Sequence, residues 1–234
     1  MCGRFQLSVK GKEISERFDI EVHDEIHRPA PGQVSATLGF NCAPFQWLPL
    51  ILNTQPFQIS YLRWGLLPSW ISDPRAASKM INARAETLHE KRAFKTAYQQ
   101  RRCLVPANGF YEWKANAIRQ PYRFFMRDES IFAFAGIWEQ WSSNNGELIS
   151  TFSIVTTSAN RLMESIHHRM PLILHRKDEK IWLGSSDINQ IQPLLKPFPD
   201  ELMDCYPISS LVNKITNDDE RLIIRQPVQQ DLFE

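Results

Sequence analysis

The chain has 234 residues, of which 43% are hydrophobic, 11% aromatic and 23% charged, and its formal net charge is +1. This composition is typical of a globular protein, and it excludes a disordered, collagenous or coiled-coil chain. The small net charge excludes a polycation, so any binding to nucleic acid must depend on a local basic patch.

The N-terminal half of the sequence predicts few regular elements. Residues 11–18 are expected to form a short helix, because Ile14 and Phe18 recur four residues apart on one face. Residues 29–62 carry no charge. Prolines and amide side chains interrupt them, so we interpret this stretch as extended, buried chain and not as a membrane span. A helix is then expected over residues 89–101, where Phe94 and Tyr98 form an apolar i,i+4 pair.

From residue 121 onward the apolar period shifts toward two, which predicts strands over residues 121–127, 131–141 and 149–157. The sequence Asn144-Asn145-Gly146 lies between the last two strands and is typical of a hairpin turn. A short helix over 159–165, a strand over 171–174 and helices near 178–183 and 187–195 complete the pattern. With no linker or repeat in the sequence, we predict one α+β domain over residues 1–234 with a mainly antiparallel, barrel-like sheet.

Cysteine and charge placement narrow the function classes. The four cysteines, at positions 2, 42, 103 and 205, form no C-x-x-C motif, and the N-terminus has no secretory hydrophobic stretch. This predicts reduced thiols and a cytoplasmic protein. Residues 73–102 hold eight Lys or Arg against three acidic residues, whereas residues 198–234 hold eight acidic residues against three basic ones. The basic segment either follows a phosphate backbone or forms a solvated helix face.

The second residue is a cysteine, which removal of the initiator methionine would leave with a free α-amine beside its thiol. The amine has an ordinary pKa of about 7.7–8.0 and the thiol one of about 8.5, so both are partly nucleophilic at neutral pH. An aldehyde attacked by this amine gives a Schiff base, and the thiol can then close onto the same carbon to form a thiazolidine. No internal cysteine or lysine can do this, although a cysteine can also occupy position 2 by chance.

Five ordered motifs give Cys2 a context. They are Met1-Cys-Gly-Arg-Phe5, Trp64-Gly-Leu-Leu-Pro-Ser-Trp70, Asn82-Ala-Arg-Ala-Glu-Thr87, Arg102-Cys-Leu-Val-Pro-Ala-Asn-Gly-Phe-Tyr-Glu-Trp113 and His167-His-Arg-Met-Pro171. In order and spacing they resemble the SOS response-associated peptidase (SRAP) family of abasic-site processing proteins, from residue 2 to about residue 215, with residues 216–234 as a tail. The resemblance implies a nucleoid-associated protein of bacterial type that shields abasic sites in single-stranded DNA through a thiazolidine crosslink.

The resemblance implies catalytic roles for four residues. Cys2 matches the family's nucleophile, and Asn82 matches an asparagine whose neutral amide can orient the amine or the sugar hydroxyl. Glu112 matches a glutamate that moves protons, and burial would raise its pKa into the useful range. His167 matches a histidine that handles proton transfer at the sugar oxygen. Judged by residue type alone, each of the last three could instead have a structural role. Asn82 could lie in a turn, Glu112 could face solvent on a strand, and His167 could serve only in packing and hydrogen bonding.

The same resemblance implies a DNA surface. Three arginines match residues that hold backbone phosphates, which suits their planar fork: Arg4, Arg84 and Arg169. Four residues would supply apolar and stacking surface for unpaired bases, although core packing is an equal alternative: Trp64, Leu66, Pro68 and Trp70. The implied partners are single-stranded DNA containing abasic sites and the replication machinery. We expect a monomer that uses no metal, cofactor or membrane.

Four other functions remain open. Cys2 could serve as the N-terminal nucleophile of a peptidase, with His167 and Glu112 as base and orienting group. A Schiff base that does not close could promote β-elimination, which would make the protein an abasic-site lyase. His23 and His27 have the spacing of zinc ligands, but Asp24 stands where zinc hydrolases need glutamate. A noncatalytic single-strand binder is the last alternative.

Overall fold

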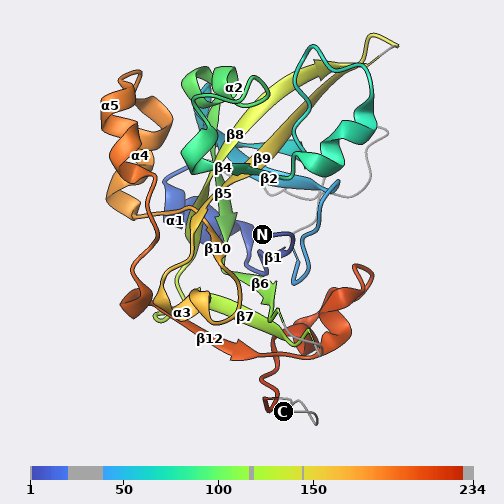
Figure 1. Ribbon diagram of the computed structural model, residues 1–234, viewed down its shortest axis with the longest axis vertical. Helices are drawn as coiled ribbons and strands as arrows, with labels where there is room; N and C mark the ends of the chain where they lie inside the picture. The colour runs from blue at the N-terminus through green and yellow to red at the C-terminus, as the bar shows by residue number, and fades with distance from the viewer. Residues whose placement is uncertain (1, 21–38, 116–118, 144, 229–234) are drawn as a thin grey trace.

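The computed structural model describes residues 2–20, 39–115, 119–143 and 145–228 (Figure 1). Its larger sheet has eight strands: β2 (Trp47–Leu52), β3 (Gln55–Trp64), β4 (Asn82–Arg84), β5 (Arg102–Ala107), β8 (Phe132–Ser142), β9 (Leu148–Ser158), β10 (Arg169–Pro171) and β11 (Ile173–Leu174). Neighbouring strands follow the order β10-β9-β3-β2-β5-β8-β11, and β4 pairs with β9. Because β8 also pairs with β9, the strands from β9 through β3, β2 and β5 to β8 close into a barrel.

A smaller sheet lies below the barrel strands in Figure 1 and joins them through a shared core. Its strands are β1 (Phe5–Gln6), β6 (Gly109–Trp113), β7 (Pro121–Met126) and β12 (Met203–Pro207), in the order β1-β6-β7-β12. Phe5 and Phe110 of this sheet pack edge-on against Phe134 of β8, with ring centroids 5.7 and 5.9 Å apart. Buried aromatic contacts of this kind hold the two sheets together.

Helices cover the outside of the sheets. They are α1 (Gly11–Phe18), α2 (Lys95–Gln100), α3 (Arg161–Glu164), α4 (Arg176–Gly184) and α5 (Ile188–Ile191). Trp182 anchors α4, because its side chain is fully buried and its indole nitrogen donates to the Cys103 carbonyl of β5 at 3.0 Å. Asn160 begins α3 as an N-cap, accepting a hydrogen bond from the Met163 amide at 3.1 Å.

The predicted fold class is confirmed: this is one α+β domain around a mainly antiparallel barrel. The helix over 11–18 forms as expected, and Ile14 is its buried residue. The strands predicted from period-two patterns are β7, β8 and β9, and the last two form the expected hairpin. Gly146 adopts a φ of +79° in its turn, which glycine allows without strain; Asn144 lies outside the described residues.

Several elements differ from the sequence expectation. The helix predicted over 89–101 begins only at Lys95. The first half of β3 is largely exposed, with Phe57 at 75%, so residues 29–62 are not buried throughout; residues 21–38 lie outside the described part. The short strands β1 and β4 carry no pattern of their own and form by pairing with β6 and β9. Both β3 and β4 run parallel to β9, an exception to the antiparallel rule.

The C-terminal segment is part of the domain. Residues 216–228 were expected to lie in a tail, yet Leu222 is fully buried beside Tyr111 and Val212. The backbone of Arg225 also pairs with that of Ile208 in an isolated antiparallel β-bridge. The packing of Leu222 beside Tyr111 joins residues about a hundred positions apart in the sequence, so no local pattern indicates it. Within the described ranges, no helix has the length and apolar character needed to cross a membrane.

Candidate functional site

The N-terminal strand carries Cys2 toward the end of β6 that holds Glu112. β1 pairs with β6 in antiparallel register, and the Tyr111 amide continues this pairing by donating to the Arg4 carbonyl at 3.0 Å. Moving from β1 toward residue 2 therefore follows β6 toward residue 112. Cys2 is completely buried at this position.

Asn82 holds the backbone of Cys2. It is the first residue of β4, whose parallel pairing with β9 places it opposite Ile154. Its side-chain amide donates to the Cys2 carbonyl oxygen at 2.8 Å. The amide oxygen Oδ1 is buried and accepts no hydrogen bond from the described residues. A buried acceptor without a donor costs free energy, and this one is available to an amine or hydroxyl group beside Cys2.

The Cys2 thiol is held in its protonated form. Burial raises the pKa of this thiol far above its ordinary value, and the negative charge of Glu112 raises it further. Its Sγ atom approaches the Arg4 carbonyl oxygen at 3.9 Å. Because a neutral thiol is a weak nucleophile, addition of this sulfur to a substrate requires a neighbouring group that moves its proton.

Glu112 is a buried carboxyl on the wall of a cavity. It lies on β6 opposite Tyr122 and is 3% exposed. The cavity has a volume of about 520 Å³ and is lined by Glu112, Trp113, Lys114, Ala115, Arg119, His167 and Asn213. Burial raises the pKa of Glu112 above its ordinary value. A carboxyl with a raised pKa can both give and take a proton closer to neutral pH.

His167 lies on the same cavity, in the turn between α3 and β10. Its Nδ1 atom accepts a hydrogen bond from the Arg169 amide at 3.0 Å and also lies 3.1 Å from the Arg169 carbonyl oxygen. Burial lowers the pKa of His167, so the imidazole is neutral at pH 7 and can accept a proton.

The three predicted phosphate-binding arginines differ in what their side chains contact. Arg84 is exposed at the end of β4, and its side chain forms no hydrogen bond or ion pair with another described residue. Arg4 donates to the Val212 carbonyl at 2.7 Å. Arg169 binds the carboxylate of Glu86 with both terminal nitrogens, at 2.6 and 2.9 Å. Arg84 is therefore free to bind an anion, whereas the other two would have to exchange or share partners.

The four residues expected to form a stacking surface fall into two groups. Trp64 and Leu66 are completely buried, and Pro68 is buried as well. Trp64 packs in the core, where its indole nitrogen donates to the Ile81 carbonyl at 2.8 Å. The structure thus corrects the expectation of stacking surface for these three residues. Trp70 is 51% exposed, and the guanidinium carbon of Arg92 lies 4.5 Å from its ring centroid.

The basic segment over 73–102 holds fewer available cations than its sequence indicates. Arg101 pairs with Glu139 at 2.6 Å. Arg102 is 3% exposed and donates to several backbone carbonyls, including that of Tyr98 at 2.7 Å. The remaining basic side chains are exposed: Arg75, Lys79, Arg84, Lys91, Arg92 and Lys95. The segment is therefore structural at its end and solvent-facing elsewhere.

Sequence reasoning missed residues that complete the cavity. Trp113 ends the motif that contains Glu112 and Lys114 directly follows it, so their place in the sequence is an available signal. Asn213 ends the short 3-10 turn Ser210–Asn213 that follows β12, and its side-chain oxygen accepts a hydrogen bond from the Trp113 indole at 2.8 Å. No local pattern points to Asn213, because its place depends on contacts across a hundred residues.

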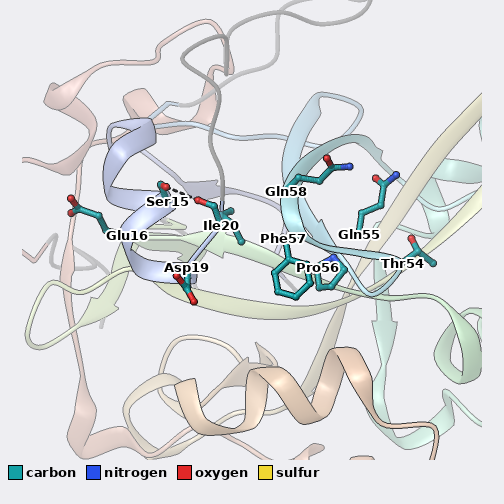
Figure 2. A pocket seen from close by; sticks show the side chains of 9 residues that line it. All are labelled: Ser15, Glu16, Asp19, Ile20, Thr54, Gln55, Pro56, Phe57 and Gln58. Carbon is teal, nitrogen blue, oxygen red and sulfur yellow. Dashed lines mark hydrogen bonds between the residues drawn. The ribbon is translucent and has the colours of Figure 1, made fainter.

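A larger pocket lies away from these residues, between α1 and the turn from β2 to β3 (Figure 2). It has a volume of about 1020 Å³ and is lined by Ser15, Glu16, Asp19, Ile20, Thr54, Gln55, Pro56, Phe57 and Gln58. The Ser15 hydroxyl already donates to the Ile20 carbonyl at 2.5 Å. Although this pocket is larger, the smaller cavity is the better candidate for a reaction site, because it is lined by both the buried carboxyl of Glu112 and the imidazole of His167.

The structure describes no group of three or more His, Cys, Asp or Glu side chains that could hold a metal ion within residues 2–20, 39–115, 119–143 and 145–228. His23 and His27, the pair with zinc-ligand spacing, lie outside the described residues. The four cysteines are free thiols.

Comparison with known proteins identifies the family. A family model described as SOS response associated peptidase (SRAP) matches residues 1–215. The chain belongs to the SRAP family. The resemblance carried by the five motifs is thereby confirmed, and the matched range contains all four predicted catalytic residues. The roles of those residues remain predictions.

Relatives of this SRAP protein match between three quarters and nearly all of its length. The abasic site processing protein YoqW of Bacillus subtilis (strain 168) is 40% identical over 230 residues, which cover 95% of this chain and 99% of the relative. The abasic site processing protein HMCES of Xenopus tropicalis is 29% identical over 212 residues, covering 76% of this chain and 63% of the relative. A solved structure from Bacteroides thetaiotaomicron matches with a TM-score of 0.85 and 32% identity, over 97% of this chain and 100% of the other.

Proposed function

We propose that this protein processes abasic sites in single-stranded DNA by forming a covalent crosslink through Cys2. The relatives named abasic site processing proteins support the substrate class. The observation that carries the proposal is the hydrogen bond from Asn82 to the Cys2 carbonyl. It holds Cys2, which bears both an α-amine and a thiol once the initiator methionine is removed, beside a carboxyl of raised pKa.

The reaction begins after the initiator methionine has been removed. The Cys2 α-amine adds to the C1′ aldehyde of the opened abasic sugar, and loss of one water gives an imine. The thiol then adds across the C=N bond, so that sulfur bonds to carbon and the thiol proton ends on nitrogen. The product is a thiazolidine, and one water is released for each crosslink formed.

Protons move when the sugar ring opens, when water leaves and when the thiol adds, and two side chains can transfer them. Glu112 delivers a proton to the departing water and then takes the proton from the Cys2 thiol as the sulfur adds, which its raised pKa favours. His167, neutral and partly exposed at the cavity, accepts the sugar hydroxyl proton as the ring opens. The buried oxygen of Asn82 accepts a hydrogen bond from the amine and so directs its lone pair.

The proposal is tested by the intact mass of the protein after mixing with an oligonucleotide that contains one abasic site. The expected mass is that of protein plus oligonucleotide minus one water. Cys2→Ser keeps the α-amine but removes the sulfur, so a stable adduct should be lost. Cys205→Ser removes the partly exposed thiol of β12 and should leave the adduct intact. An adduct that still forms when an uncleaved tag precedes Cys2 would refute the thiazolidine.

Peptidase and lyase activities predict other outcomes of the same mixture. Turnover of peptides without a DNA adduct would favour an N-terminal nucleophile peptidase. Cys2→Ala keeps the amine, so its imine cannot close, and weak nicking of the DNA strand is expected. Nicking by the wild-type protein at the rate of adduct formation would indicate a lyase.

A further inference from the structure

The guanidinium group of Arg169 is occupied by a carboxylate of the same chain. Its two terminal nitrogens donate to the two carboxylate oxygens of Glu86 at 2.6 and 2.9 Å. One of them also donates to the Thr156 carbonyl at 2.7 Å. The Arg169 side chain is 11% exposed, whereas that of Glu86 is 50% exposed. The arginine is thus held from behind by β9, and the carboxylate covers it on the solvent side.

A phosphate group binds arginine with the same two-pronged geometry as a carboxylate. The position that Glu86 occupies is therefore the one a backbone phosphate would take. Glu86 lies in a short 3-10 turn, Ala85–Thr87, just after β4, and its half-exposed side chain can rotate into solvent. Arg169 cannot follow, because β10 pairs with β9 and Thr156 holds its guanidinium group.

A second cation lies close to the pair. Arg84 is exposed and lies two residues before Glu86. The hydrogen bond from Arg169 is the main cause that lowers the pKa of Glu86, and the positive charges of Arg169 and Arg84 lower it further. The carboxylate is therefore ionised at neutral pH and competes with phosphate for Arg169. Its position is also close to the chemistry, since the backbone of Arg169 contacts Nδ1 of His167.

We infer that Glu86 is an internal competitor that a DNA backbone phosphate displaces from Arg169 on binding. This inference rests on the proposed function only in taking single-stranded DNA as the ligand. It makes Glu86 a residue that weakens binding of DNA in general. A strand that gains further contacts in the site, such as an abasic strand engaging Cys2, offsets the cost of the exchange.

The test uses fluorescence anisotropy with an undamaged single-stranded oligonucleotide, so that no crosslink contributes. Glu86→Gln should bind about fivefold more tightly than wild type, the upper end for a half-exposed ion pair. Glu90→Gln is the matched control, because Glu90 is an exposed glutamate of the same segment that contacts His89 at 3.3 Å. It removes the same charge and should change affinity less.

Two further variants separate occupancy from charge and from folding. Glu86→Asp keeps the charge, but its side chain is one methylene group shorter and does not reach the Arg169 guanidinium group from the same backbone position, so it should also tighten binding. In an Arg169→Gln background, Glu86→Gln should give no gain over Glu90→Gln. Thermal melting checks that each variant is folded.

The outcomes are distinct. Glu86→Gln binding no more tightly than Glu90→Gln would overturn the inference, and weaker binding would show that Glu86 supports Arg169. Normal binding without any adduct on abasic DNA would overturn the crosslink alone. Failure of the wild-type protein to bind single-stranded DNA at low salt would overturn both proposals.

Discussion

Two buried glutamates in different regions of this molecule have contrasting surroundings. Glu179 on α4 and Glu112 on β6 are 6% and 3% exposed. Glu179 accepts hydrogen bonds from both terminal nitrogens of Arg17, at 2.5 and 3.1 Å, which ties α1 to α4. Glu112 instead faces a cavity that it shares with the imidazole of His167.

The contrast shows how the fold separates structural from chemical use of a buried carboxyl. Burial raises the pKa of both groups, and at Glu179 the Arg17 hydrogen bonds offset part of that increase. An arginine fork stabilises the ionised carboxylate and keeps it in place. At Glu112 burial is the largest influence on the pKa, and a carboxyl with a raised pKa can exchange its proton with a substrate.

Replacing Glu112 tests the chemical side of the contrast and should give the largest effect. Loss of a general acid or base typically slows a reaction by about 10²–10⁴-fold. We expect Glu112→Gln to slow crosslink formation by this factor while the protein stays folded, measured as adduct against time on denaturing gels. Glu179→Gln is the matched control and should react at the wild-type rate per folded molecule. Equal slowing in both variants would mean that Glu112 acts only through the fold.

Replacing Glu179 tests the structural side. The Arg17 side chain is 14% exposed, and Glu179→Gln would leave its charge buried without an anion. Breaking a buried ion pair in this way costs about 3–5 kcal/mol of unfolding free energy. Urea denaturation of the variant measures this cost. A loss below about 1 kcal/mol, as for a surface pair, would show that the pair does not hold α1 against α4.

The tryptophans of one motif extend the contrast to aromatic side chains. Trp70 is half-exposed beside the basic segment, whereas Trp64 is core. Loss of one stacking aromatic typically costs about 1–3 kcal/mol per base, so Trp70→Ala should weaken binding of single-stranded DNA about 5- to 150-fold. Phe57→Ala removes an exposed aromatic at the distant pocket and should leave affinity unchanged. Similar affinities for wild type and Trp70→Ala would remove Trp70 from the DNA surface.

The smallest expected effect is a change with pH in the stability of the folded protein, and it arises from Glu112. Because burial raises the pKa of Glu112 above its ordinary value of 4.5, the folded protein keeps a proton that the unfolded chain has lost. Stability therefore falls as pH rises from about 4.5 through the raised pKa, and the cost is complete above it, at about 1.4 kcal/mol for each pH unit between the two pKa values. Melting temperatures from pH 4 to 8 should show Glu112→Gln becoming more stable than wild type as pH rises. A constant difference would mean that the pKa is not raised.

Local pattern predicted the elements that have enough residues to show a period. The helix over 11–18 and the long hairpin of β8 and β9 follow directly from the spacing of apolar residues. β4 has only three residues, and its strand geometry comes from pairing with β9. Residues 89–94 share the apolar pattern of a helix but form turns before α2, so tertiary contacts overrode local preference there.

The order of the amino acids specifies which chemical groups are available: a cysteine beside a prospective N-terminus, and motifs that place an asparagine, a glutamate and a histidine in a known order. Which of these groups are buried, and what they contact, follows from the tertiary fold. The bond from Asn82 to Cys2 and the pairing of Arg169 with Glu86 each join residues about eighty positions apart. Burial and partner choice set pKa values and availability, and both depend on long-range packing that no local spacing encodes.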